Sequence, residues 1–335
     1  MSMLICEKCF RDDSIIYDIE QKSKIDGKCD VCGKQGKLVD LDEIRDFFDE
    51  LIQLFQIDEE SDDTLVSMIQ KEWGIFADED CAVAILSEVL FSNGCSMTIT
   101  DKVSYNSTIK EGESVWENLK KEIREKSRFF SKSDVLDDNY ALFERLTLHK
   151  DDKLFRARIT PADKRKFKPK DMGCPPGELS KAGRSNPLGI SYLYLSKDIE
   201  TTYYEVRATF LDNVSVGKFV LGSDLNLIDF DSERSIYSLY NDGSYTLADI
   251  VLNKKLMKAI SVDMSKPLRR YDTELEYIPT QWICEYCKVK LGADGVSFKS
   301  ALQEGGKNIV LFDPTKAKCV SVESHVIRRI SIARN

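Results

Sequence analysis

The sequence predicts an α+β protein built from three successive parts. Three observations carry this prediction: two Cys-x-x-Cys motifs near the start, helical spacing of apolar residues up to residue 150, and an irregular alternation of strand-like and helix-like runs after it. We therefore expect a zinc knuckle over residues 1–37, an α-helical domain over 38–150 and an α+β domain over 151–335.

The two Cys-x-x-Cys motifs predict a structural metal site. Nineteen residues separate the two motifs, a spacing that suits four thiolates around one Zn²⁺, and the protein fills all four ligand positions. The expected ligands are Cys6, Cys9, Cys29 and Cys32. A third such motif, Cys284 and Cys287, lies in an expected helix, and there we favour two core residues over a metal site.

Apolar residues recur at three- and four-residue spacing through most of the second part. These stripes predict helices over residues 41–55, 64–73, 81–91, 115–130 and 139–148. Asp62 and Asp80 each precede a stripe and are expected to cap a helix. Arg145 and His149 have only three residues between them, fewer than the arginine–histidine motif of helical RNases requires, so a surface helix end is expected there.

The third part mixes short strands with helices. Strands are expected over residues 154–159, 192–195, 206–211, 218–221, 225–229, 295–298, 308–312 and 319–325, and helices over 198–205 and 279–291, with Gln281 at the start of the second helix. No GxGxxG or GxxxxGK[ST] motif is present, so the standard nucleotide-binding fingerprints are absent from the sequence.

Composition and charge narrow the class of protein. The chain is 42% hydrophobic and 31% charged, has no run of 18 apolar residues and does not begin like a secretion signal, so we expect a soluble cytoplasmic protein without a membrane span. Residues 1–150 contain 19 Lys and Arg against 33 Asp and Glu, a balance of −14, whereas residues 151–335 contain 29 against 24, a balance of +5. The net charge of −9 argues against a general nucleic-acid binder, and the basic half suits an anionic small ligand.

One stretch of the third part combines an arginine, a tyrosine pair and a single carboxylate. Arg184 lies in a turn-rich loop, Tyr192 and Tyr194 share one face of a strand, and Glu205 ends a helix. Taken one at a time, each residue is explained by packing or solvation. Taken together, they could grip a phosphorylated ligand and stabilise a cation that forms when a nicotinamide–ribose bond breaks.

Five motifs in order decide between these explanations. LFRARI, MGCPPGELSKAGRSNPLGISYLYLS, ETTYYEV, GVSFKS and GGKNIVLFD together resemble the RES-domain family over roughly residues 150–330. The resemblance implies a fold related to ADP-ribosyltransferases and the consumption of NAD⁺ by a bacterial toxin. The region before it is similar to the N-terminal HEPN/RES domain found in one subgroup.

The resemblance also implies roles for individual residues. Arg156 would contact the diphosphate of NAD⁺ or its nicotinamide ribose, and Arg184 would contact the phosphates. Tyr194 would position that ribose, and Glu205 would stabilise the cation. The family serine matches Ser300, although Ser297 lies three residues before it. The family usually has tryptophan after the second arginine, where this chain has Ser185, so any wall that the tryptophan provides must come from elsewhere. Lys181 matches no family position, although it could help to bind phosphate.

The expected function is therefore NAD⁺ cleavage by a toxin or an effector of antiphage defence, acting as a glycohydrolase or a phosphorylase. Protein ADP-ribosylation is the alternative within the same chemistry, and an RNA-binding or RNase module in the helical part is the alternative from another class. An unrestrained NAD⁺ consumer would harm its host, so an antitoxin or a trigger protein is an expected partner, and a homo-oligomer remains open.

Overall fold

The computed structural model describes residues 3–94, 96–129, 136, 143–266 and 274–329, which fold as two compact units. The first unit comprises Met1–Val115 and Glu233–Lys255, and the second comprises Trp116–Ser232 and Leu256–Asn335. These units do not coincide with the expected division at residue 150. A local helical pattern indicates a helix but not the core that the helix joins.

A small antiparallel sheet and one helix hold the N-terminal residues of the first unit. The sheet has the order β1-β3-β2, with the bounds β1 (Leu4–Cys6), β2 (Ile25–Lys28) and β3 (Gln35–Asp40). The short 3-10 helix η1 (Glu7–Cys9) and helix α1 (Asp13–Lys22) follow β1. The carboxylate of Asp12 accepts from the backbone N–H groups of Ser14 and Ile15, which fixes the start of α1.

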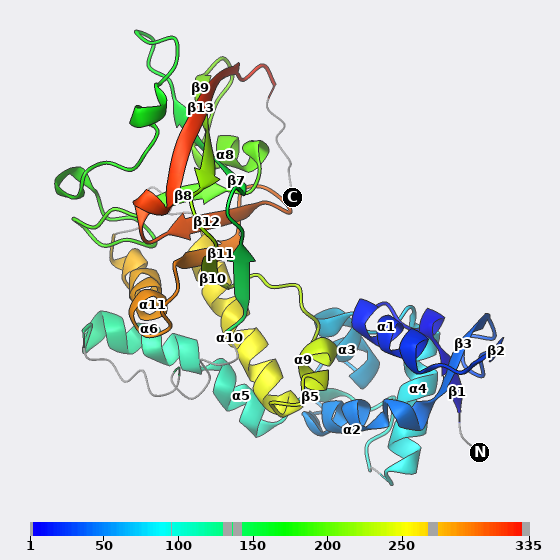
Figure 1. Ribbon diagram of the computed structural model, residues 1–335. Coiled ribbons are helices and arrows are strands. Elements are labelled where there is room, and N and C mark those ends of the chain that lie inside the picture. The colour runs from blue at the N-terminus through cyan, green and yellow to red at the C-terminus, as the bar shows by residue number, and fades with distance from the viewer. Residues whose placement is uncertain (1–2, 95, 130–135, 137–142, 267–273, 330–335) are drawn as a thin grey trace. The chain divides into compact units, whose positions relative to one another are not determined.

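The rest of the first unit is mainly helical (Figure 1). Its elements are η2 (Leu41–Glu43), α2 (Arg45–Gln53), β4 (Phe55–Ile57), α3 (Leu65–Trp73), α4 (Glu79–Ser92), β5 (Val103–Tyr105), α5 (Ser107–Glu113) and, much later in the chain, α9 (Ile236–Asn241). Thr64 caps α3 and Asp78 caps α4, so the predicted caps Asp62 and Asp80 are wrong. Asp80 already lies in the first turn of α4, where its side chain cannot reach back to cap the helix.

The segment Glu233–Lys255 joins the first unit through tyrosines that bond to carboxylates. The Tyr237 hydroxyl donates to Asp18, and the Tyr237 ring packs edge-on against Phe47 at 5.0 Å between centroids. The Tyr240 hydroxyl donates to Glu50 at 3.1 Å. These contacts bring a segment of the later sequence into the core of the first unit.

The second unit is built on an eight-stranded sheet of order β13-β9-β7-β8-β12-β11-β10-β6. Only β10 and β11 pair in parallel; all other neighbours are antiparallel. The bounds are β6 (Arg145–Leu148), β7 (Lys153–Ile159), β8 (Leu193–Ser196), β9 (Asn213–Leu221), β10 (Leu225–Asp229), β11 (Gly295–Lys299), β12 (Lys307–Leu311) and β13 (Ala317–Val326).

Helices cover one face of this sheet, and Phe167 and Met172 from the loop before β8 pack on part of the other. One apolar core joins α6 (Val115–Glu125), the last part of α10 (Leu247–Ser265) and α11 (Ile278–Val289) to β10, β11 and β12. Helix α8 (Ile199–Glu205) packs near β7 and β9. The connections contain η4 (Pro169–Asp171), η5 (Gly177–Leu179), η6 (Glu274–Tyr277) and η7 (Pro314–Lys316). Cys284 and Cys287 are fully buried in the apolar core between these helices and the sheet, which confirms them as core residues.

Several elements differ from the sequence-based expectation. The predicted helix over 41–55 is wrong as a single element, because the chain forms η2, α2 and the start of β4 there. Of the predicted helix over 139–148, residues 139–142 lie outside the described residues and Arg145–Leu148 form β6, an edge strand paired with β10. The predicted strand over 206–211 is wrong, because Arg207 and Leu211 have φ of 51° and 68° and the chain turns before β9. Helix α10 was not predicted, because its apolar residues lie on several sides and leave no single stripe.

Helix α10 has 19 residues, yet neither it nor any other described helix has the length and apolar character to cross a membrane.

Gly295 provides a test of the pairing between β11 and β12. A Cβ at this position would lie 2.2 Å from the Val310 carbonyl oxygen, far inside van der Waals contact. Gly295→Ala should therefore destabilise the second unit by about 1–3 kcal/mol, measured as a lower midpoint of urea unfolding by far-UV circular dichroism. Gly222→Ala is the control, since its Cβ would lie an ordinary 3.7 Å from the Lys316 carbonyl oxygen. Equal midpoints for the two variants would contradict this account.

Candidate functional site

A cavity of about 370 Å³ lies within the second unit and gathers four of the predicted site residues. Arg156, Arg184, Tyr194 and Glu205 all line it, although they come from β7, the loop before β8, β8 and the end of α8. Its volume lies within the range of about 300–1,000 Å³ typical of ligand pockets.

Glu205 is the last residue of α8, a helix whose start is capped by Asp198. Its Oε1 accepts two hydrogen bonds, from Ser300 Oγ at 2.8 Å and from Asn308 Nδ2 at 2.6 Å. The carboxylate belongs to an exposed residue, yet two buried donors hold it at the cavity. Charge-assisted bonds of this length are among the stronger hydrogen bonds in proteins.

The two candidate serines differ in their hydrogen bonds. Ser300 Oγ accepts from the backbone N–H groups of Leu302 and Gln303 at 3.2 and 3.3 Å, which leaves its proton for Glu205. Ser297 lies on β11, is fully buried, and its Oγ has no hydrogen-bond partner among the described residues. Ser300 is therefore the serine that contacts the site carboxylate.

Tyr194 links β8 by hydrogen bonds to the loop that carries Arg184 (residues 183–187, the arginine loop). Its hydroxyl donates to Asn186 Oδ1 at 2.7 Å and accepts from the Ser185 backbone N–H at 3.0 Å. Burial raises the pKa of Tyr194 to about 12, so the hydroxyl stays neutral and can donate at physiological pH. Tyr192, which precedes β8, instead lies in the core and donates to Glu285.

Arg184 caps the end of α10. Its Nη1 donates to the Met264 carbonyl at 2.6 Å, and its guanidinium lies 5.9 Å from the centre of the Tyr277 ring. Burial lowers the pKa of Arg184, and the nearby Tyr277 and Glu205 oppose that shift. A guanidinium nevertheless remains charged in proteins, so the cavity keeps this cation.

Two side chains of α11 hold the loop that carries Arg184. Gln281 Nε2 donates to the carbonyls of Gly183 and Asn186 at 2.8 and 3.1 Å. Thr280 Oγ1 donates to the Arg184 carbonyl at 2.7 Å. Gln281 thus lies near the start of its helix as expected, and in addition fixes the arginine loop.

Arg156 lies half-buried on β7 and carries an unsatisfied donor. Its Nη1 is buried and has no hydrogen-bond partner among the described residues. Burial lowers the pKa of Arg156, and the neighbouring Arg158 adds to that effect. A buried guanidinium nitrogen without a partner is costly, and an anionic ligand would satisfy it.

Three aromatic residues besides Tyr194 line the cavity, whereas Ser185 does not. Ser185 is fully buried, whereas Phe155, Tyr277 and Phe298 line the cavity. Lys181 is exposed and lies outside the lining.

The residues of the RNase alternative lie apart from the cavity. Arg145, on β6, donates to the Leu291 carbonyl at 3.1 Å. His149 is 72% exposed and lies 3.8 Å from an Asp224 carboxylate oxygen. The expected helix end at these residues is wrong, because the segment is a strand.

Sequence reasoning missed Asn308 and its neighbour Ser196, which both line the cavity. A signal for Asn308 was present: a buried amide next to the apolar residues Ile309 to Leu311 of the same strand needs a partner.

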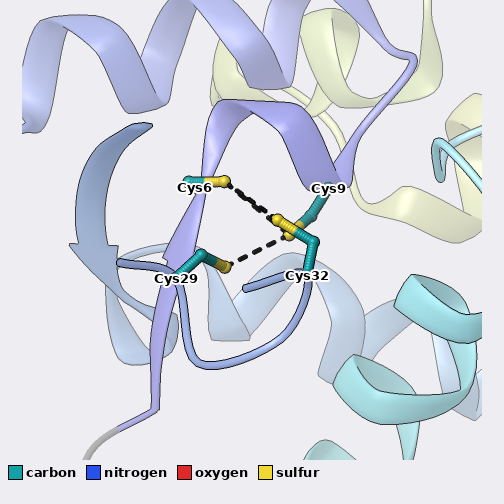
Figure 2. A group of neighbouring side chains, drawn as sticks. All are labelled: Cys6, Cys9, Cys29 and Cys32. Carbon is teal, nitrogen blue, oxygen red and sulfur yellow. Dashed lines mark hydrogen bonds between the residues drawn. The ribbon is translucent and has the colours of Figure 1, made fainter. Parts of the chain in front are cut away.

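The four predicted metal ligands converge in the first unit. Figure 2 shows the sulfurs of Cys6, Cys9, Cys29 and Cys32 facing one another from two short segments of chain. Neighbouring sulfurs lie 3.5, 3.5 and 4.0 Å apart, and all four lie within 4.8 Å of one another. Tetrahedral ligands at about 2.3 Å from a zinc ion would lie roughly 3.8 Å apart.

The surroundings of these sulfurs fit a bound metal ion. Val31 N–H donates to Cys29 Sγ at 3.4 Å, and Gly33 adopts the positive φ of 68° that closes the turn after Cys32. Burial raises the pKa of the Cys6 thiol to about 12, so a cation is needed to turn it into a thiolate ligand. The set could therefore hold a metal ion.

Comparisons with known proteins identify the family. A model of the RES domain matches residues 153–332, more than half of the chain. No curated protein matches. Among solved structures, a chain of the M. tuberculosis MbcT–MbcA toxin–antitoxin complex is similar at 16% identity, with a TM-score of 0.31, over 53% of this chain and 86% of that chain. The predicted fold class is confirmed as a mixed α and β protein with a RES domain in its C-terminal part. The chain belongs to the RES domain family.

Proposed function

We propose that this chain cleaves the nicotinamide–ribose bond of NAD⁺. The observation that carries the proposal is the Glu205 carboxylate, held by Ser300 and Asn308 in the cavity that Arg156 and Arg184 also line. A fixed anion in a cavity that two arginines also line suits a ligand that has phosphates at one end and develops positive charge at the other.

The proposed reaction needs one carboxylate. The C1′–N bond breaks heterolytically, its electron pair leaves with the pyridinium nitrogen, and nicotinamide departs as a neutral molecule. No general acid is required, because the leaving group is already positively charged. The ribose becomes an oxocarbenium cation, which Glu205 stabilises electrostatically. With water as acceptor, the products are ADP-ribose, nicotinamide and one proton.

The two arginines would bind the diphosphate. The unsatisfied Nη1 of Arg156 is available as a donor, while Arg184 keeps further N–H groups beyond the one that bonds Met264. Tyr194 would meet the ligand with its ring, because its hydroxyl is already engaged with Asn186 and Ser185.

The products of the reaction would identify the molecule that accepts the ADP-ribosyl cation. Water gives ADP-ribose, inorganic phosphate gives a phosphorylated ADP-ribose, and a protein acceptor gives a covalently labelled protein. All three begin from the same cation, so the site residues are compatible with each. Incubation with NAD⁺, with and without phosphate and protein, distinguishes the outcomes.

A toxin role follows from the reaction itself. Continuous loss of NAD⁺ harms the cell that makes the enzyme, so we propose that an antitoxin, or a trigger sensed by the acidic N-terminal half, restrains it. The four-cysteine cluster would bind zinc in a structural role, since all four ligand positions are cysteines and leave none for a substrate.

The first test replaces the carboxylate. Glu205→Gln keeps the shape of the side chain and removes its charge, so nicotinamide release should fall on the order of 10²–10³-fold, measured by chromatography of reactions with NAD⁺. Glu200→Gln is the matched control, because it makes the same change on the exposed part of α8 outside the cavity lining. Similar rates for the two variants would refute the role of Glu205.

A second test concerns the metal. Atomic spectroscopy should find one zinc per chain, and Cys9→Ser should lose it, whereas Cys319→Ser on β13 should retain it. Because no cavity residue belongs to the cysteine cluster, gentle chelation should change the initial rate of nicotinamide release less than about threefold. A rate that fell in proportion to zinc content would contradict a structural role.

A further inference from the structure

We infer that Asn308 is a positioning residue that, oriented by Ser196, selects which oxygen of Glu205 faces the ligand. The inference rests on the proposed cleavage of NAD⁺ and goes beyond it, because it assigns separate tasks to the two carboxylate oxygens. It starts from the antiparallel register of β8 and β12, which sets Asn308 opposite Ser196.

The hydrogen-bond chain around Asn308 has a single consistent direction. An ionised carboxylate only accepts, so the amide nitrogen of Asn308 must face Glu205, and Nδ2 lies 2.6 Å from Oε1. The amide oxygen then faces the other way and needs a donor. Ser196 Oγ supplies it at 3.1 Å, so the serine fixes the amide in the orientation that serves Glu205.

Burial makes this arrangement costly to break. Ser196 is 3% exposed and Asn308 is 9% exposed, so water would replace a lost bond poorly. An amide within an apolar strand is destabilising unless both of its ends are bonded. Asn308 meets this condition, with Ser196 at one end and Glu205 at the other.

Both donors reach the same oxygen of the carboxylate. Ser300 and Asn308 come from opposite sides of the turn between β11 and β12, and each donates to Glu205 Oε1. In the described part of the chain no hydrogen bond to Oε2 occurs. Two donors from different positions stop the carboxylate from rotating. Oε2 is then the oxygen that faces the ribose and stabilises its positive charge.

Ser300 alone would not achieve this. A single hydrogen bond allows Oε1 to move on an arc about its donor. A second donor fixes the position of Oε1 and thereby the rotation of the carboxylate about its Cγ–Cδ bond. Misplacing a catalytic group by about 1 Å can cost on the order of 10²-fold in rate. The second donor should thus affect the chemical step more than the binding of NAD⁺, which depends on the arginines.

The test compares kcat with KM in the full-length chain. Asn308→Ala should lower kcat for nicotinamide release about 10- to 100-fold and change KM for NAD⁺ less than about threefold. Asn308→Asp keeps the shape but removes the donor and places a second carboxylate beside Glu205, so it should lower kcat at least as much. Asn226→Ala, the same change at an exposed side chain of β10, is the control for the sheet.

A double-mutant cycle separates positioning from stability. Ser196→Ala should lower kcat about three- to tenfold in the natural chain and should have no further effect in the Asn308→Ala background, because Ser196 acts through Asn308. Multiplicative effects, or a loss confined to KM, would overturn the inference. Normal kcat in Asn308→Ala and Asn308→Asp would overturn it while leaving NAD⁺ cleavage intact. A wild-type chain that releases no nicotinamide would overturn the proposed function and this inference with it.

Discussion

The antiparallel register of β8 with β12 is the constraint on which the cavity depends. It sets Ser196 opposite Asn308 and, because side chains alternate, brings both to the face of the sheet that also carries Tyr194. A slip of one residue would replace this polar set with Leu195 and Ile309, which now fill the core on the opposite face. Apolar packing on that opposite face therefore specifies the register, and the register places the polar side chains of the site.

The arginine loop has no regular secondary structure and relies on side chains for its shape. Its backbone N–H and carbonyl groups, which no strand or helix pairs, are bonded by Gln281, Thr280 and Tyr194, which belong to two different elements. Gly183 completes the turn, since a Cβ there would lie 2.5 Å from Asn186 Oδ1 and 2.9 Å from the Tyr194 hydroxyl. The position of Arg184 thus depends on α11 and β8 as much as on its own loop.

Four residues that line the cavity were predicted from sequence because they lie in short motifs that occur in a fixed order. Glu205, Tyr194 and Arg184 were predicted as site residues without a structure, and the helix that ends at Glu205 was a local signal. The sequence signals that Asn308 needs a buried partner but does not identify Ser196 as that partner, since the pairing spans more than one hundred residues. For the same reason, no local pattern could show that Glu233–Lys255 joins the first unit and not the RES core.

The electrostatics of the cavity connect ligand binding with the proposed chemistry. In the ligand-free cavity, Arg184 and Glu205 interact, so each partly neutralises the field of the other. A bound diphosphate would take over Arg184 and Arg156, whose charges it matches. The field of Glu205 would then act on the ribose, where the positive charge develops. Contacts far from the breaking bond would thereby lower the energy of the transition state more than that of the bound substrate.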